Sequence, residues 1–343
     1  YAVPLKLRAT EAGSLLASDR IDAAVILTSG SHGALAAEAL LTGLPVFVEK
    51  PLAFTLAEAD GLAAIVARTT GRIQVGYMKL YDPAVIRAGR ILAERAVAGR
   101  PPVRSIEVTV LHPTSESQLA QSHLLPPPTD LPTDRLAELR AAADALRAAA
   151  IGVVPTELGR LYSEILLGSV VHDLALIRAF VGDPIAVDHV DVWPDGVWPP
   201  SVAIEGRLPG DARFSIRWHF LPGYPEYRES VRLHFEDGSI ELLFPAPYLL
   251  HAPTLLTVTG AGGGSATDTH HRSHVEAFEE ELVAFHALVT RGTPPAAGLA
   301  EGRADIVTCQ RIVATFGASR GIAIGGEAGA ARAVETPGGA TGR

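Results

Sequence analysis

Three short apolar runs alternate with helix-type segments over the first eighty residues, and this rhythm constrains the fold more than any other feature. The runs at 23–27, 45–48 and 73–76 have the length and composition of buried strands. Between them, residues 33–42 and the segment that begins at Thr55 have the composition of helices. Strand, helix, strand, helix and strand joined by short connections predict a parallel sheet that is covered by helices on both faces.

The second of these helices carries its own start signal. Thr55 and Glu58 have the spacing of a capping box, in which each side chain satisfies a free backbone N–H at the helix N-terminus. Apolar residues then recur at helical spacing and predict one buried face: Leu56, Ala59, Leu62, Ala63 and Val66.

The pattern changes after residue 81. The segments expected there are a helix near 84–98, a strand at 103–111, a Ser-, Gln- and Pro-rich loop at 113–132, and helices at 133–150 and 157–181. Several strands without long intervening helices follow between 185 and 258, among them 214–220 and 230–235. Grouping of this kind predicts a largely antiparallel sheet in an α+β domain.

Two helices close the expected fold, at 273–291 and 298–320. Ser273 and Glu276 have capping-box spacing at the start of the first. The Gly-rich segment 260–265 predicts a mobile loop, and the tail from Gly325 predicts a frayed end. We therefore expect three parts: a dinucleotide-type domain at 1–80, an α/β domain at 81–325 and a flexible tail at 326–343.

Charge and composition exclude several classes of protein. The chain has 38 acidic and 29 basic residues and a net charge of −9, whereas a nucleic-acid partner favours the opposite field. Its apolar runs are far shorter than the ~20 residues of a membrane span, so no membrane partner is expected. Cys309 is the single cysteine, which fits a reducing compartment such as the cytoplasm.

Lys50 is the first candidate for chemistry. It is one of only three lysines and follows the apolar run 45–48 directly, within Glu49-Lys50-Pro51. Ligands bind at the carboxyl ends of the strands in parallel α/β sheets. A buried amine can titrate toward neutral pH and act as an acid or base. The alternative is a lysine at the edge of a loop, before a turn proline.

Four segments together resemble the Gfo/Idh/MocA oxidoreductases, which are NAD(P)-dependent sugar and polyol dehydrogenases. The first is Thr28–Pro51, with His32, Ala39-Leu40, Gly43 and Glu49-Lys50-Pro51 in order and spacing. The others are 76–83, His172-Asp173-Leu174 with Gly182, and 276–285 with 292–295. Leu80 stands where an arginine is usual. The resemblance covers most of residues 15–320.

The resemblance implies roles for particular residues. Lys50 would exchange the proton of the substrate hydroxyl, and His172 would share or relay it. Glu49 would anchor the strand end or the ribose, and Pro51 would fix the turn, through a cis peptide in this family. Thr28, Ser29, Ser31 and His32 lie where the cofactor loop passes, although a capping or packing role for His32 is an equal alternative. Gly168 and Asp173 would border the substrate.

Two departures from the family pattern stand out. No Gly-x-Gly-x-x-Gly turn, which binds the pyrophosphate, is present after an early strand. We therefore expect that two strands with their helices, roughly 50–60 residues, precede Tyr1, the alternative being a short protein that binds no nucleotide. Gly168 stands where the family has an aspartate, four residues before His172 and so on the same helix face. Glycine there leaves room for a substrate or permits close helix packing. Asp173 points about 100° away and is a doubtful substitute.

The function expected from the resemblance is hydride transfer between NAD or NADP and a sugar, polyol or related hydroxyl or carbonyl substrate, by a homo-oligomer. The second sheet would form the substrate wall and subunit surface. A different class remains open, namely a nucleotide-sensing regulator without catalysis. His270, His271 and His274 imitate a metal cluster, but no acidic or cysteine ligand completes it, so no metal is expected.

Overall fold

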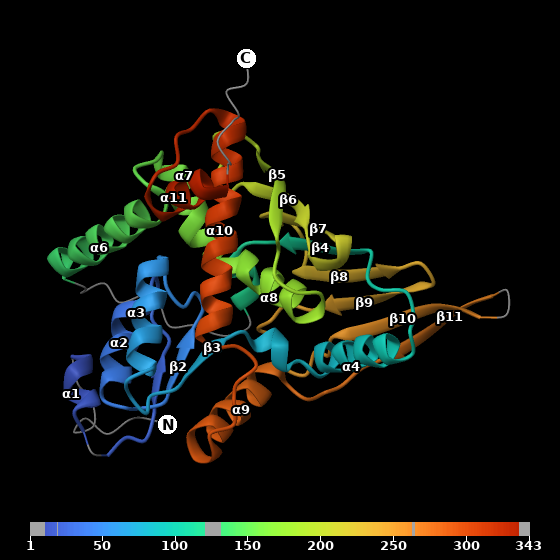
Figure 1. Ribbon diagram of the computed structural model, residues 1–343, viewed down its shortest axis with the longest axis horizontal. Helices are drawn as coiled ribbons and strands as arrows, with labels where there is room; N and C mark the ends of the chain where they lie inside the picture. The colour runs from blue at the N-terminus through green and yellow to red at the C-terminus, as the bar shows by residue number, and fades with distance from the viewer. Residues whose placement is uncertain (1–10, 19, 121–131, 263–264, 336–343) are drawn as a thin grey trace.

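The computed structural model describes residues 11–18, 20–120, 132–262 and 265–335. Two sheets organise these residues, with long helices between them (Figure 1). This confirms the expected fold class, a Rossmann-like parallel sheet followed by a mostly antiparallel one.

The first sheet has three parallel strands in the order β1-β2-β3, which are β1 (Ala24–Ile26), β2 (Val46–Glu49) and β3 (Ile73–Gly76). Alternation along β2 sends Val46 and Val48 to the main core, whereas Phe47 points the other way and meets Phe285 edge-on. That phenylalanine belongs to α9 (Ala277–Arg291), so a helix from the far end of the chain covers the second face of the sheet.

The helices between these strands begin and end close to the expected positions. They are α2 (Gly33–Leu41) and α3 (Leu56–Val66), preceded by a short α1 (Ala12–Leu16). The capping box at Thr55 and Glu58 is confirmed. The expected buried face of α3 is right for Ala59 and Leu62 and wrong for Ala63, which is exposed while Ile65 is buried.

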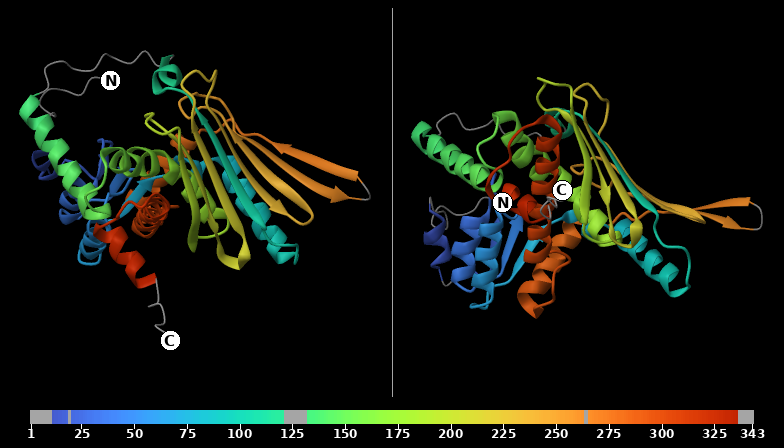
Figure 2. Two further views of the ribbon diagram at one scale, coloured as in Figure 1. Left: turned by 90° about the horizontal axis from the view of Figure 1, so that it is seen from above. Right: turned by 45° about the horizontal axis from the view of Figure 1, so that its top comes forward.

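The second sheet has eight strands in the order β11-β10-β9-β8-β4-β7-β6-β5. Its strands are β4 (Ser105–His112), β5 (Ala186–Trp193), β6 (Ser201–Arg207), β7 (Arg213–Phe220), β8 (Arg228–Phe235), β9 (Gly238–Phe244), β10 (Leu255–Gly262) and β11 (Ser265–His271). Of the pairings in this order, only that of β4 with β7 is parallel. The hairpin β10–β11 projects beyond the helical layer (Figure 2). Most of the segment 260–265 therefore lies in paired strands, contrary to the expected loop, and residues 263–264 lie outside the described part.

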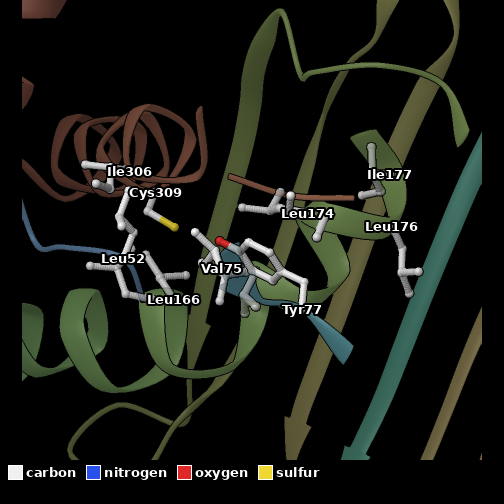
Figure 3. Packing of buried hydrophobic residues seen from close by; sticks show 14 of the residues in the cluster. Leu52, Val75, Tyr77, Leu166, Leu174, Leu176, Ile177, Ile306 and Cys309 are labelled. Atoms are coloured by element: carbon white, nitrogen blue, oxygen red, sulfur yellow. The ribbon is translucent and has the colours of Figure 1, made fainter. Parts of the chain in front are cut away.

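Three helices fill the space between the sheets. They are α8 (Val171–Phe180), α10 (Leu299–Arg320) and a π-helix (Leu161–Val170). Leu166 of the π-helix and Cys309 of α10 approach Tyr77 and Leu52 from the first domain (Figure 3). One continuous apolar core thus joins both sheets, which fixes the cleft between them.

The segment expected as one helix at 157–181 is more complex. It begins as α7 (Thr156–Arg160), widens into the π-helix and returns to α-helical geometry in α8. Its i→i+5 hydrogen bonds are uncommon in proteins and are often found at functional sites.

Several other expectations need correction. The capping box at Ser273 and Glu276 is absent, because the Glu276 carboxylate accepts the backbone N–H of His251 instead. The tail is not wholly frayed: α11 (Gly326–Glu335) packs on α6 (Thr133–Ile151), and residues 336–343 lie outside the described part. The loop at 113–132 contains a short helix, α5 (Ser115–Leu119), and its residues 121–131 are not described.

The tail helix has a clear reason to form. The Glu327 carboxylate accepts the backbone N–H groups of Leu56 (2.7 Å) and Ala57 (2.9 Å), which are free donors at the start of α3. The remaining elements are the 3-10 turns Met78–Tyr81 and Pro209–Asp211 and the helix α4 (Pro83–Val97). Among the residues searched, no helix is long and apolar enough to cross a membrane.

Candidate active site

A cleft of about 570 Å³ lies between the carboxyl end of β2 and the second sheet. The structure brings together on its walls five of the residues singled out from the sequence: Glu49, Lys50, Gly168, His172 and Asp173. The Lys50–Pro51 peptide is cis, as the family resemblance implied. Residues separated by more than a hundred positions in the chain therefore share one opening.

Lys50 crosses the cleft with its ammonium group. Its Nζ donates a hydrogen bond to the carbonyl oxygen of Gly168 in the π-helix. Burial lowers the pKa of Lys50, the carboxylate of Glu49 opposes this, and the ammonium of Lys79 lowers the pKa further. The amine is therefore a better proton acceptor near neutral pH than an exposed lysine.

His172 lies in the first turn of α8 with its ring pressed against Tyr77. The two rings meet edge to face, with 6.2 Å between their centroids. Burial lowers the pKa of His172 well below its usual value, and the charges of Lys50 and Lys79 act in the same direction. The imidazole is thus neutral at pH 7, and its buried Nδ1 has no hydrogen-bond partner among the described residues.

The hydroxyl of Tyr77 is fixed from the other side. It donates to Asp305, and the guanidinium of Arg178 binds the second oxygen of that carboxylate. Burial raises the pKa of Asp305 to about 6, and Arg178 and Tyr77 oppose this. The network holds the Tyr77 ring in place under His172.

Gly168 is not explained by close packing. A Cβ added there would meet only the Ser163 carbonyl oxygen at 3.6 Å, which is an ordinary contact. The glycine therefore leaves space on the cleft wall that a larger side chain would fill, in agreement with the first of its two interpretations.

Asp173 does line the cleft, although its position beside His172 made it a doubtful site residue. It is 1% exposed and lies 3.8 Å from Lys79 Nζ. Lys79 in turn contacts Glu229 of β8. Sequence reasoning missed Lys79 as a cleft residue and Glu229 as its partner; the rarity of lysine in this chain was the one available signal for Lys79.

The loop after β1 is mostly committed to internal contacts. Nδ1 and Nε2 of His32 each lie 2.6 Å from a carbonyl oxygen, of Pro51 and Thr28 respectively. The Ser31 hydroxyl donates to Glu58 at 2.6 Å. Both ring nitrogens of His32 are therefore engaged within the protein, which favours the packing interpretation, and Thr28 and Ser29 are exposed polar residues of this loop.

The three histidines that imitate a metal cluster in the sequence lie on or just after one strand. His270 and His271 lie on β11, and His274 follows that strand. In the part of the chain that was searched, no group of three His, Cys, Asp or Glu side chains has the geometry to hold a metal ion.

The structure has two sheets, and an amine and an imidazole face one cleft between them. Residues 6–77 match the family described as "Oxidoreductase family, NAD-binding Rossmann fold", which is the Gfo/Idh/MocA family. This part of the chain therefore resembles that family.

Similar proteins support this resemblance. A segment of 71 residues is 39% identical to scyllo-inositol 2-dehydrogenase (NAD(+)) of Bacillus subtilis (strain 168), and covers 20% of this chain and 21% of that enzyme. The match thus spans about a fifth of the length of that curated relative.

Two solved structures share the fold over most of the chain. UDP-N-acetylglucosamine 3-dehydrogenase GnnA from Acidithiobacillus ferrooxidans has 17% identity and a TM-score of 0.63, with 90% of this chain and 82% of that chain covered. Aldose-aldose oxidoreductase from Caulobacter crescentus has 16% identity and a TM-score of 0.64, with 90% and 80% covered. At these identities the likeness establishes the shared fold.

The family's nucleotide cofactor can be tested against the residues present. Glu49 and Lys50 border the cleft at the carboxyl end of β2, directly before the cis Pro51, and the unpartnered Nδ1 of His172 lies across it. These groups fit the nicotinamide end of a dinucleotide. The described residues contain no Gly-x-Gly-x-x-Gly turn between a strand and a helix.

Proposed function

We propose that the protein is a dehydrogenase that uses NAD or NADP and acts on a CH–OH group of a sugar, polyol or related substrate. One observation carries the proposal: the buried amine of Lys50 and the neutral, unpartnered imidazole of His172 face the same cleft at the carboxyl end of β2. A deprotonatable amine beside a second acid–base group is what oxidation of a hydroxyl requires.

The nicotinamide, when bound, supplies the hydride acceptor or donor. Lys50 accepts the substrate hydroxyl proton in oxidation and donates it in reduction, exchanging the Gly168 carbonyl for the substrate oxygen. His172 donates or accepts the second hydrogen bond to that oxygen, which orients it toward the amine. Since burial lowers the pKa of Lys50, we expect the oxidation rate to rise with pH through that lowered value.

Glu49 holds the end of the strand in this mechanism. Its carboxylate accepts the backbone N–H of Lys50 at 3.1 Å, and burial raises its pKa. We assign it to fixing the direction of the lysine. We also propose that residues 1–80 contribute the nucleotide side and 81–325 the substrate side, with the 3-10 turn at Met78–Tyr81 as the junction.

The test is a pair of variants at Lys50. Lys50→Met removes the amine, and Lys50→Arg keeps a cation that does not deprotonate. Both should lower turnover by ~10²–10⁴-fold, the usual range for a general acid or base. Turnover is measured with NAD and NADP against inositols, aldoses and UDP-N-acetylglucosamine, and nucleotide binding by NADH fluorescence.

The possible results separate the candidate functions. Unchanged turnover in Lys50→Arg contradicts the assignment of the proton acceptor. Nucleotide binding by the wild type without turnover on any substrate favours the nucleotide-sensing regulator. No response to NADH at all contradicts both.

A further inference from the structure

A buried charged cluster lies between the cleft and a second, smaller cavity. We call it the carboxyl cluster; its members are Lys79, Asp173, Tyr227 and Glu229. Lys79 Nζ lies 2.5 Å from Glu229 and 3.8 Å from Asp173, and the Tyr227 hydroxyl donates to Glu229. Glu229 is fully buried and Asp173 is nearly so.

The cluster has two carboxyl groups for one ammonium. Each carboxyl also keeps one buried oxygen without a hydrogen-bond partner among the described residues: Oδ2 of Asp173 and Oε1 of Glu229. Two carboxylates that share a buried site do not both ionise readily. Burial and the charge of Glu229 raise the pKa of Asp173, and Lys79 opposes this. Asp173 therefore holds a proton more readily than an exposed carboxyl group does, with the Glu229 carboxyl beside it.

The two carboxyl groups lie on different sides of the wall. Asp173 borders the cleft, whereas Glu229 borders a second cavity of about 60 Å³. Lys79 and Tyr227 border both. The small cavity has room for several water molecules and is lined by further titratable groups, including Asp82 and His274.

The proposed reaction requires an outlet for a proton. In oxidation the carbinol C–H bond breaks with its electron pair as hydride to the nicotinamide, the C=O bond forms, and the hydroxyl proton goes to Lys50. Lys50 must lose that proton before the next turnover. The Gly168 carbonyl, to which Lys50 donates, accepts a hydrogen bond but does not carry a proton away.

We propose that Asp173 and Glu229 form a proton relay from the cleft to the small cavity. This inference rests on the proposed dehydrogenase function. The proton passes from Lys50 through water in the cleft to Asp173, from the carboxyl pair to water in the small cavity, and then to solvent. Lys79 and Tyr227 are positioning residues that hold the two carboxyl groups within reach of each other.

The first experiment needs neither cofactor nor substrate. Infrared spectra of the protein at pH 7 in H₂O and D₂O report protonated carboxyl groups. The wild type minus Glu229→Gln and the wild type minus Asp173→Asn spectra should each show the loss of a buried carboxylic acid band. Glu241→Gln, on the neighbouring strand β9 and paired with Arg232, serves as the matched control and should leave the band in place. A band unchanged in both cluster variants overturns the shared proton.

The second experiment measures oxidation by the holoenzyme in different concentrations of a small buffer such as imidazole. Glu229→Gln should lower kcat by ~10²-fold, the lower end for an acid–base group, without raising KM in proportion. Added buffer should restore part of the rate, because it carries the proton that the relay no longer carries. Wild type and Glu241→Gln should not respond to buffer.

The outcomes distinguish the two proposals. Normal kcat in Glu229→Gln, or a low kcat that buffer does not raise, overturns the relay and leaves the dehydrogenase function standing. A wild type that oxidises no substrate overturns both.

Discussion

The polar side chains in the loop after β1 differ from those on α8 and β8 in whether they have hydrogen-bond partners. In the loop, His32 contacts two carbonyl oxygens and Ser31 donates to Glu58, so these side chains are already partnered. At and behind the cleft, Nδ1 of His172, Oδ2 of Asp173 and Oε1 of Glu229 are buried without partners in the described structure. Unpartnered buried groups cost stability, and they are retained where a substrate or a proton completes them.

Loss of the His172 imidazole should have the largest effect on turnover. We expect His172→Asn to fold normally and to lose ~10²–10⁴-fold in turnover, because asparagine does not exchange a proton. His189→Asn, at an exposed position of β5, is the matched control. The measurement is kcat/KM in both reaction directions. If His172→Asn keeps the wild-type kcat/KM, the imidazole has only a structural role, like the partnered side chains of the loop after β1.

Removal of the Lys79 ammonium should be the largest change in stability. Lys79→Met leaves two buried carboxyl groups without a counterion, and breaking a buried ion pair costs about 3–5 kcal/mol. The folded variant then binds protons more tightly than the unfolded chain, so its free energy of unfolding should fall as the pH rises above ~4. Urea titrations at several pH values measure this. A pH dependence no steeper than that of the wild type would argue against a carboxyl pair, because Glu281 contributes a pH dependence of its own.

Glu281 tests whether an unpartnered carboxyl outside the cleft also costs stability. It lies on α9, its Oε1 has no partner in the described structure, and burial raises its pKa to about 8, with Glu49 adding to the shift. A carboxyl whose pKa is raised on folding makes the protein less stable as the pH rises from about 4.5 to about 8. Glu281→Gln should remove that dependence and stabilise the protein above pH 8 by a few kcal/mol. A slope that persists in the variant would assign it to another group.

The satisfied loop should show the smallest effect. Ser31→Ala loses one hydrogen bond to Glu58, so we expect a loss of about 1 kcal/mol in the free energy of unfolding. Affinity for NADH should not change if the hydroxyl serves the loop alone. A clear loss of NADH affinity would instead give Ser31 the cofactor role that the family resemblance implied.

Local patterns were sufficient for the first sheet and for the position of Lys50. Buried parallel strands are short apolar runs, and the residue after such a run lies at the ligand-binding edge. The carboxyl cluster has no such local signature, because Lys79 and Glu229 are 150 positions apart, in the 3-10 turn Met78–Tyr81 and on β8 respectively. Contacts between distant segments also explain the errors. Glu276 binds the chain at His251, and Glu327 binds the start of α3, and neither contact is visible in a local pattern.

The π-helix at Leu161–Val170 sets the orientation of α8, which follows it directly in the chain. Each residue of an α-helix turns the chain by about 100°, so the removal of one residue from the widened stretch would rotate α8 relative to α7 by roughly that angle. The His172 imidazole would then no longer face the cleft, although nearly all apolar residues of the segment would be unchanged. An insertion or deletion of one residue in this stretch would thus change which side chains of α8 face the cleft, while both sheets keep their strands.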